Sequence, residues 1–188
     1  MNRKILTFIL TITFLLFLDS PSIAVIDDYQ DAVDAYNRED YKTSYQLMLP
    51  LAKKGFAQAQ YNLGVMYEKG KGVKQNHRKA KKWFSLAADQ GLIQAQTTLA
   101  SMYHEGEGVS KNYEAASKWY HLAAEQGDAD AQYKLGLMYS NGEGISQDNK
   151  EATKWFQLAV EQGNTLAQEK LDEILNKNNL WKKIKDIF

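Results

Sequence analysis

Apolar and polar positions recur along the chain every 36 residues from residue 55 onward. Nine-residue segments that begin at Ala59, Ala95 and Ala131 align without a gap, and each starts with Ala-Gln and ends with Met-Tyr. The same step relates Trp83, Trp119 and Trp155. A register kept over three copies indicates a repeat protein in which each copy is one structural unit.

The apolar spacing within each copy predicts two amphipathic helices. In the first copy, Ala59, Leu63, Met66 and Tyr67 fall at i, i+4, i+7 and i+8, which is one face of a helix. The stretch 80–88 has the same kind of spacing, with Trp and Phe among alanines. A lone helix pair would expose its apolar face, so the copies are expected to stack on one another. We therefore predict an all-α solenoid of stacked helix-turn-helix repeats.

Glycines and short polar residues mark the expected helix ends. The Gly-x-Gly after each first helix supplies positions with positive φ, and the second helices are expected to have N-caps at Asn76, Asn112 and Asp148. Glu151 is spaced to complete a capping box with Asp148. Small residues in the first helix predict a close approach of the partner helix at three equivalent positions, namely Gly64, Ala100 and Gly136.

The repeat register also predicts the organisation of the chain. Three repeats are expected at 57–92, 93–128 and 129–164. Because a stack leaves an apolar face open at each end, caps are expected on both sides. They are a degenerate capping repeat at 25–56, and a capping helix with an amphipathic tail at 165–188. In the last segment Asp172 replaces the glycine of the repeats, which relaxes the close contact there.

Residues 1–24 resemble a signal peptide. Arg3 and Lys4 precede an apolar run of 14 residues, 5–18, which is short for a membrane span, and Pro21 then ends the helix. Small residues at Ser22 and Ala24 suit cleavage after Ala24. The expected mature protein is exported, either periplasmic or secreted, with an uncleaved N-terminal anchor as the alternative.

The residues of each copy resemble a known family. The pattern is Ala-Gln-x-x-Leu-Gly-x-Met-Tyr, then Gly-x-Gly-Val, then Ala-x-x-Trp-(Phe/Tyr)-x-Leu-Ala-Ala-(Asp/Glu)-Gln-Gly. It is similar to the Sel1-like repeat, a relative of the tetratricopeptide repeat, over residues 57–164, with 27–56 similar to a half-degenerate unit. The resemblance implies a right-handed superhelix whose first helices line a concave face, and an adaptor or scaffold role. Bacterial members are often exported and take part in envelope assembly, signalling or host contact.

Composition and motifs argue against chemistry in this chain. The 23 basic and 23 acidic residues balance, and without residues 1–24 they number 21 and 22, which is too even for a dedicated nucleic-acid binder. The chain has no cysteine, which excludes disulfides, zinc-thiolate sites and thiol catalysis. It therefore also departs from a cysteine-rich subgroup of the family that resembles β-lactamase-like proteins. The three histidines, His77, His104 and His121, occupy different slots of the repeat and lack ligand spacing.

The sequence therefore predicts a protein-binding module rather than an enzyme, with no catalytic residue, cofactor or metal. The alternative is a cell-wall or glycan-binding protein, or a weak hydrolase of the β-lactamase-like kind. That alternative needs converging acid and base residues, and the sequence offers none.

Positions off the apolar stripe of the first helices differ between copies and are expected to line the concave face. Tolerance on a solvated face explains the same variation equally well at any single position. Tyr61, Tyr133 and Leu137 are the stronger candidates, because exposed aromatic and apolar groups are enriched at interfaces. The full set of candidate partner-binding residues is Tyr61, Asn62, Val65, Glu68, Thr97, Thr98, Ser101, His104, Tyr133, Lys134, Leu137 and Ser140.

Two further features could bind a partner. Range 27–40 holds six acids against one base, whereas 69–82 holds seven bases and no acid. The basic second helix could contact an anionic surface, such as lipid headgroups, or an acidic partner, or it could simply be solvated. The C-terminal tail has the spacing of a basic amphipathic helix, which either caps the last repeat or docks on a membrane or partner. Its candidate docking residues are Trp181, Ile184 and Phe188.

Overall fold

A computed structural model describes the backbone of residues 21–185 and the side chains of residues 25–176, so most of the predicted signal peptide lies outside it. The described chain is all helical: α2 (Pro21–Asn37), α3 (Tyr41–Lys53), α4 (Ala57–Lys69), α5 (His77–Asp89), α6 (Ile93–Glu105), α7 (Tyr113–Glu125), α8 (Ala129–Asn141), α9 (Asn149–Glu161) and α10 (Thr165–Lys185). The predicted all-α helical-repeat solenoid is confirmed. Over the same residues, no helix is both long and apolar enough to cross a membrane.

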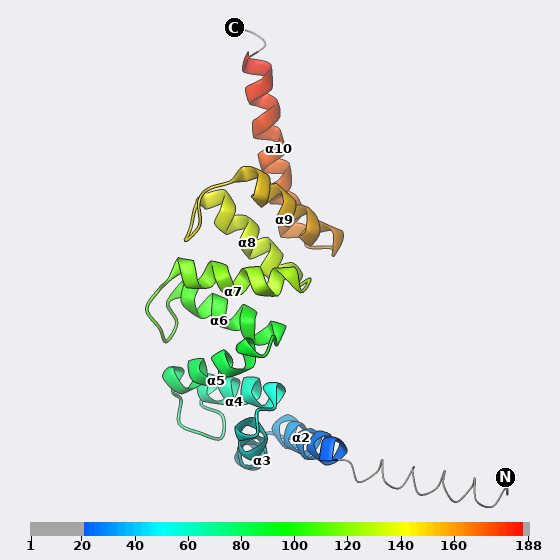
Figure 1. Cartoon of the computed structure of the whole chain (residues 1–188), viewed down its shortest axis with the longest axis vertical. Helices are drawn as coiled ribbons and strands as arrows, with labels where there is room; N and C mark the ends of the chain where they lie inside the picture. Colours follow the sequence, from blue (N-terminus) through cyan, green and yellow to red (C-terminus); the bar gives the residue numbers. More distant parts are fainter. Residues whose placement is uncertain (1–20, 186–188) are drawn as a thin grey trace, which may run out of the picture. The chain divides into compact units, whose positions relative to one another are not determined.

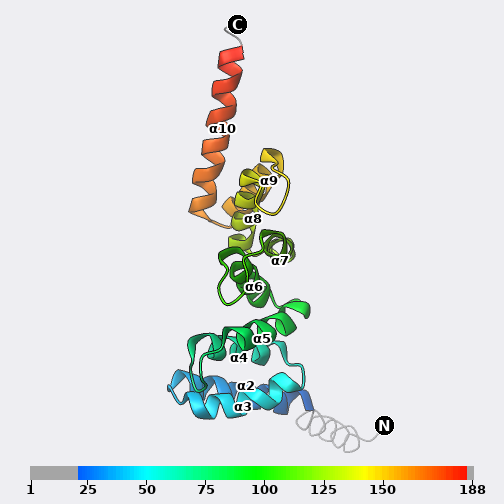
Figure 2. The ribbon, with the colours of Figure 1, turned by 90° about the vertical axis from the view of Figure 1, so that its left-hand side faces the viewer.

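The helices group into two compact units, which are described separately. Unit 1 contains α2, α3 and α4 and ends at Asn76, and unit 2 begins at His77 and contains α5 to α10. In unit 1, α3 packs against both α2 and α4. In unit 2, each helix packs against the next, and Figures 1 and 2 show α6 to α9 as successive layers.

The core of unit 2 combines alanines with a few large side chains. Ala116, Ala123 and Ala131 are fully buried, and they let the helices approach Tyr120 and Leu135. A second cluster joins Phe156 of α9 to the buried side of α10. Burial of a large apolar side chain such as Leu135 stabilises the fold by about 1.5 to 3 kcal/mol. This packing explains the alanines at fixed positions of each repeat.

The first helices end as the Gly-x-Gly pattern predicts. Gly70, Gly106 and Gly142 have φ of 68°, 80° and 73°, the left-handed region that glycine adopts without a steric penalty. The loop then turns back on the helix it leaves. In unit 2 the Asn112 N–H donates to the carbonyl of Tyr103 at 2.8 Å, and the equivalent bond to Tyr139 is 2.9 Å. The loops after α6 and α8 are therefore built alike.

The predicted side-chain caps at Asn112 and Asp148 are present, but the predicted capping box is wrong. Asn112 Oδ1 accepts from the backbone N–H of Ala115 at 2.9 Å. Asp148 Oδ1 accepts from the N–H groups of residues 150 and 151 at 2.8 and 3.1 Å. The Asp148 N–H cannot serve Glu151, because it already donates to the carbonyl of Tyr139. Glu151 instead lies 3.5 Å from the Lys154 ammonium.

Buried glutamines join each first helix to the preceding second helix. In unit 2, Gln96 Nε2 donates to the Ala88 carbonyl at 3.2 Å, and Gln132 Nε2 donates to the Ala124 carbonyl at 3.1 Å. Their own carbonyl oxygens accept from Gln126 and Gln162 at 2.7 and 2.8 Å. Unit 1 has the same bond from Gln60 to the Ala52 carbonyl at 3.1 Å. Each of these buried amides thus has a partner, as buried polar groups require.

α10 repeats a first helix on one side only. Ala167, Leu171 and Ile174 are buried against α9, as their register predicts, whereas Leu175, which belongs to the same predicted register, is 45% exposed. The opposite side carries exposed Gln168 and Asp172, whose side chains are hydrogen-bonded at 3.0 Å. The ribbon of α10 runs on past α9 (Figure 2). The side chains beyond residue 176 lie outside the described part, so both readings of the tail stay predictions.

Candidate functional site

A groove of about 420 Å³ opens in unit 1 between the two first helices, α2 and α4. Residues of α2 at i, i+4, i+7 and i+8 form one wall, and residues of α4 at i, i+1, i+4 and i+8 form the other. The buried side chain of Met48, on α3, lies beneath them. The wall residues are Tyr29, Val33, Tyr36 and Asn37 on α2, and Tyr61, Asn62, Val65 and Lys69 on α4.

Hydrogen bonds and ring contacts hold the tyrosines of the α2 wall in place. Asn62 Nδ2 donates to the Tyr29 hydroxyl across the groove at 2.9 Å, and the Tyr29 ring meets Phe56 edge-on at 5.0 Å. At the other end of α2, the Tyr36 ring meets the Tyr41 ring at 5.1 Å.

A lysine of the following loop secures the same end of the groove. Lys71 Nζ lies 5.1 Å from the Tyr36 ring centre and donates to the Tyr41 hydroxyl at 2.9 Å, and this hydrogen bond raises the pKa of Lys71. The two tyrosines of the α2 wall, Tyr29 and Tyr36, are thus positioned before any ligand arrives, which lowers the entropy cost of binding.

The lining has the chemistry of a binding site rather than of a reaction site. Tyrosine, valine and methionine side chains offer apolar surface, two asparagines offer amide donors and acceptors, and Lys69 is the charged residue of the lining. Such a mixture fits apolar side chains and backbone groups of a bound segment. Across the described residues, no three His, Asp or Glu side chains are grouped so as to hold a metal ion.

Three of the four predicted residues in unit 1, Tyr61, Asn62 and Val65, line this groove, whereas Glu68 lies on α4 outside the lining. The sequence interpretation missed the α2 wall because it treated the degenerate repeat as a cap only. Tyr29, Val33 and Tyr36 are spaced at i, i+4 and i+7, which places them on one helix face. This spacing is the sequence signal from which the α2 wall could have been predicted. The groove therefore unites predicted residues with residues of the predicted cap.

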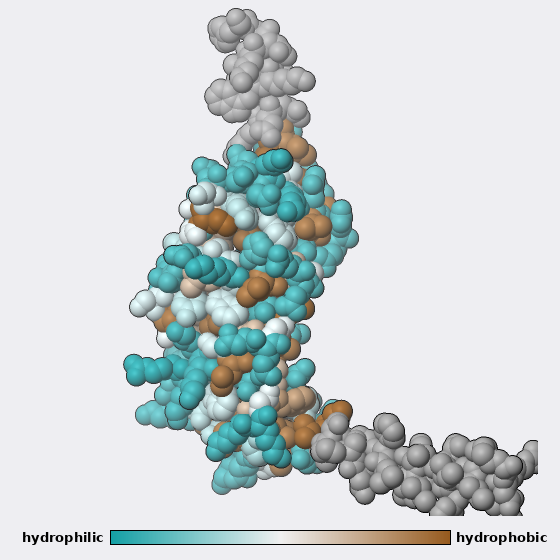
Figure 3. Space-filling view, in the orientation of Figure 1, coloured by the Kyte–Doolittle hydropathy of each residue, from teal (hydrophilic) through white to brown (hydrophobic). Residues whose placement is uncertain are grey.

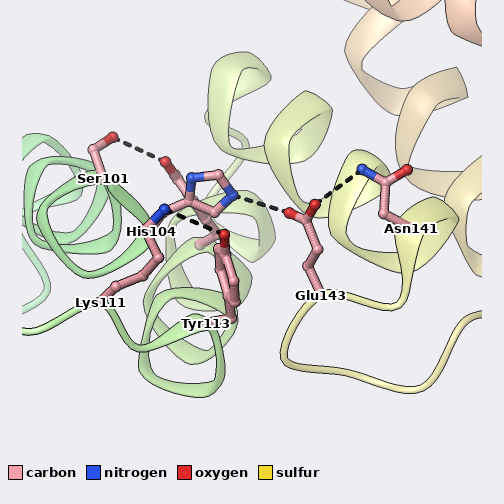
Figure 4. A network of polar contacts seen from close by, with 7 residues as sticks. Ser101, His104, Lys111, Tyr113, Asn141 and Glu143 are labelled. Atoms are coloured by element: carbon pink, nitrogen blue, oxygen red, sulfur yellow. Dashed lines mark hydrogen bonds and ion pairs between the residues drawn. The ribbon is translucent and has the colours of Figure 1, made fainter. Parts of the chain in front are cut away.

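Two predicted residues of α6 belong to a polar network, shown in Figure 4. Ser101 Oγ and the Tyr120 hydroxyl are 2.9 Å apart, and burial raises the pKa of Tyr120. His104 Nε2 lies 3.1 Å from Glu143 Oε2, and Asn141 donates to the other oxygen of Glu143 at 3.3 Å. This network ties α6 to the loop after α8.

The other predicted residues of unit 2 have varied surroundings. Thr97 Oγ1 is buried without a hydrogen-bond partner, so this hydroxyl cannot reach a ligand. Tyr133 and Leu137 are half-buried against the cluster of α9 and α10, and only their remaining surface faces outward. Thr98, Lys134 and Ser140 are half-exposed.

The candidate docking residues of the tail fall beyond what is described: the side chains of Trp181 and Ile184, and all of Phe188. On the face drawn in Figure 3, the described surface is mainly hydrophilic, with small separate hydrophobic areas.

Known proteins share this helical-repeat architecture. The Sel1 repeat matches residues 57–92, 93–128 and 129–164. A protective antigen of uropathogenic Escherichia coli with an SLR fold shares 36% identity over 73% of this chain, with a TM-score of 0.71. A Sel1 repeat protein of Oxalobacter formigenes shares 34% identity over 76%, also with a TM-score of 0.71. The chain spans only 30% and 58% of these two proteins.

More distant comparisons add the fold alone. Helicobacter pylori cysteine rich protein B covers 76% of the chain, and the chain covers 96% of it, at 21% identity and a TM-score of 0.52. No curated protein matches the chain. Sel1 repeat proteins are generally scaffolds for protein–protein interaction. With three matched repeats over more than half of its length, the chain belongs to the Sel1 repeat family.

Proposed function

We propose that this protein is an exported interaction scaffold that binds a segment of a partner protein through the concave side of its first helices. The observation that carries the proposal is the groove between α2 and α4, in which hydrogen bonds and ring contacts hold Tyr29 and Tyr36 of the α2 wall in place. Its volume of about 420 Å³ suits a few side chains of a peptide. The bound segment presents apolar or aromatic side chains to the tyrosines and backbone groups to the asparagines. Envelope assembly, signalling and host contact are the settings proposed for this binding.

The repeat itself supplies the substitutions that test the groove. Thr97 and Ser101 stand in the second repeat where Tyr61 and Val65 stand in the first. Tyr61→Thr with Val65→Ser therefore introduces the side chains that α6 has at the equivalent positions. The double variant and the natural chain are used as baits in an extract of the native envelope, and captured partners are quantified by mass spectrometry. A partner that uses the groove is expected to bind the double variant at least about 10-fold more weakly, since buried aromatic contacts dominate interfaces.

A matched control removes apolar surface elsewhere. Leu122 on α7 is 44% exposed, and Leu122→Ser leaves the groove residues unchanged. The control is expected to capture the same partners as the natural chain, and circular dichroism is used to check that all baits are folded. If the double variant also captures the same partners at the same level, the groove is not the binding site and the proposal fails.

Export is the second part of the proposal. The basic start, the apolar run and the small residues before Val25 support cleavage after Ala24. Cleavage there removes the first four residues of α2 and keeps all four groove residues of that helix, so the mature form retains the site. N-terminal sequencing of the protein from its native cells is expected to begin at Val25. A chain that keeps Met1 and stays in the cytoplasm would contradict export.

A further inference from the structure

A second pocket, in unit 2, is lined by basic residues. It has a volume of about 380 Å³ and lies between the start of α5, the end of α6 and the loop that follows α6. The loop is seated against α5, because a Cβ on Gly108 would clash with the His77 side chain. The lining residues are Arg78, Lys81, Tyr103, Gly108, Val109, Ser110, Lys111 and Asn112. The lining of this pocket therefore contains three cationic side chains and no carboxylate.

These three cations have no acidic partner among the described residues. Among the side chains of residues 25–176, no carboxylate lies within ion-pair distance of Arg78, Lys81 or Lys111. The two lysines rest on aromatic rings instead. Lys81 Nζ is 5.0 Å from the Tyr103 ring centre, and Lys111 Nζ is 5.4 Å from that of Tyr113. The pocket thus holds three charges that the protein itself does not neutralise.

Comparison between repeats shows that the fold does not require these charges. One repeat later, the equivalents of Arg78, Lys81 and Lys111 are Glu114, Ser117 and Gln147. Glu114 pairs with Lys118 at 2.6 Å, and the Ser117 hydroxyl donates to the Glu114 carbonyl at 2.9 Å. The same helix pairing is therefore built without a cation at any of these three positions.

Lys111 also replaces a residue with a structural role. The equivalents of Lys111 in the following and preceding repeats are Gln147 and Gln75. Gln147 donates to the Ser140 carbonyl at 2.8 Å, and Gln75 donates to the Glu68 carbonyl at 2.7 Å. Both bonds hold the loop against the last turn of the first helix. In the repeat between them, this bond is replaced by a cation at the rim of the pocket, within 3.4 Å of the Tyr113 hydroxyl. A structural hydrogen bond has been exchanged for a positive charge that faces solvent.

We propose that this pocket binds a phosphate group. A phosphate ester carries a charge between about −1.5 and −2 at pH 7 and has several strong acceptor oxygens. The Arg78 guanidinium can bind two of these oxygens as a fork, and the lysines supply point charges. A single carboxylate would be satisfied by the arginine alone and would leave Lys81 and Lys111 unused. The Ser110 hydroxyl offers a neutral donor at the same rim. The site lies on other helices than the groove and goes beyond the proposed scaffold function.

The test uses the full chain and inorganic phosphate as the probe. The triple variant Arg78→Gln, Lys81→Ser, Lys111→Gln removes three positive charges and takes two of its residues from the following repeat. Backbone amide NMR shifts are followed during titration in low-salt buffer, with chloride at equal ionic strength as the blank. We expect saturable shifts at the residues of the pocket, and affinity at least about 10-fold weaker in the triple variant, because charge-assisted hydrogen bonds are lost.

A control variant with the same loss of charge is available in unit 1. Lys42, Lys53 and Lys54 are exposed and lie outside both pockets, and all three are changed to Gln. The control is expected to bind phosphate within about 2-fold of the natural chain, since screening limits the reach of distant charges. Equal weakening in both triple variants, or shifts that do not saturate, would overturn the proposal.

Vesicles distinguish the two sources of phosphate. The same three proteins are sedimented with vesicles of phosphatidylcholine alone and with vesicles that contain phosphatidylglycerol. If the anionic vesicles bind more protein, and only the pocket variant loses the gain, the phosphate belongs to a lipid headgroup. If the gain is absent while inorganic phosphate binds the pocket, the ligand is a free phosphate ester. A gain that the pocket variant keeps, without phosphate binding, contradicts the site.

Discussion

Gly136 and Gln132 on α8 show how single residues hold neighbouring helices together. A Cβ on Gly136 would lie 2.6 Å from Cε1 of Phe156, a ring that is fully buried and cannot move aside. Gln132, four residues earlier, is 4% exposed and bonds to the Ala124 carbonyl of α7 and to the side chain of Gln162, the residue that follows α9. Gly136 allows the close approach of α9 because it has no side chain. Gln132 links its neighbours because its buried side-chain amide is hydrogen-bonded through both its nitrogen and its oxygen.

Gly136→Ala is expected to destabilise unit 2. The added methyl overpacks a filled core, which costs about 1 to 3 kcal/mol. Urea unfolding monitored by circular dichroism measures the change. Ala100→Gly in the equivalent position of α6 is the comparison, since a Cβ is already accommodated there, and a loss of about 1 to 2 kcal/mol is expected from the removed buried methyl group and the lower helix propensity, without any overpacking. Equal or greater stability of the Gly136→Ala protein would show that the ring contact does not limit the approach of α9.

Gln132→Leu is expected to cost about 1 to 3 kcal/mol, because the Ala124 carbonyl and the Gln162 amide lose a buried partner. Gln168→Leu is the matched substitution in α10, where the amide is exposed and bonds only to Asp172. Its effect is expected to stay within about 0.5 kcal/mol. If the two variants have the same thermal midpoint, the glutamine contacts do not join the repeats.

At the scale of the helix, the ends depend on short polar side chains whose partners are local. Asp40 caps α3, where its Oδ1 accepts from the N–H of Thr43 at 3.1 Å. Asp128 caps α8 in the same way, with a bond of 2.7 Å to the N–H of Ala131. The equivalent positions before α4 and α6 are Phe56 and Leu92, which make no side-chain cap. Equivalent helices of the repeats are therefore capped to different degrees.

Asp40 gives unit 1 a measurable dependence on acid. Hydrogen bonds from Thr43 hold the pKa of the Asp40 carboxyl below its ordinary value of 3.8. Because the folded pKa is the lower one, the stabilising effect is complete above pH 3.8 and is lost as pH falls through the folded pKa.

The Asp40→Asn variant provides the comparison, because asparagine also caps helices but does not titrate in this range. Thermal midpoints of both proteins are measured between pH 6 and pH 2.5. The natural chain is expected to lose stability relative to the variant only at the acid end of this range. A constant difference at all pH values would show that Asp40 is not bonded as a carboxylate.

At the scale of the whole molecule, the period of 36 residues made the helices and glycine turns predictable, since spacing alone determines them. Contacts that depend on relative placement were not predictable. The N–H of Asp148 could have bonded to Glu151, and only the path of the loop brings Tyr139 to it first. The α2 wall of the groove was missed for a related reason, since Tyr29 and Asn62 are 33 residues apart in the sequence and only the packing of the helices brings their side chains together. Periodicity therefore predicts which residues share a helix face, but it does not predict which side chains of different helices meet.

Contacts between neighbouring helices also predict how a local defect spreads. Because each helix of unit 2 packs mainly against the next, loosening should decay along the chain. In the Gly136→Ala protein, hydrogen exchange is expected to rise most in α8 and α9, and to stay near its natural rate in α2 to α4. Mass spectrometry of peptic peptides measures both regions in one sample. Uniformly faster exchange along the chain would contradict nearest-neighbour stability.

The polar side of α10 limits where the gene can gain further repeats. If the 36-residue copy 129–164 is duplicated and inserted before Thr165, the first helix of the copy has a glycine at the position of Gly136. The second helix of the copy can pack on that glycine as α9 packs on α8, so the array can grow there in frame. A copy appended behind α10 would bring its second helix onto Asp172 and Gln168, where a buried carboxylate would replace the glycine of α8. We therefore expect relatives with more repeats to have gained them inside the array, with the sequence of α10 carried along at its end.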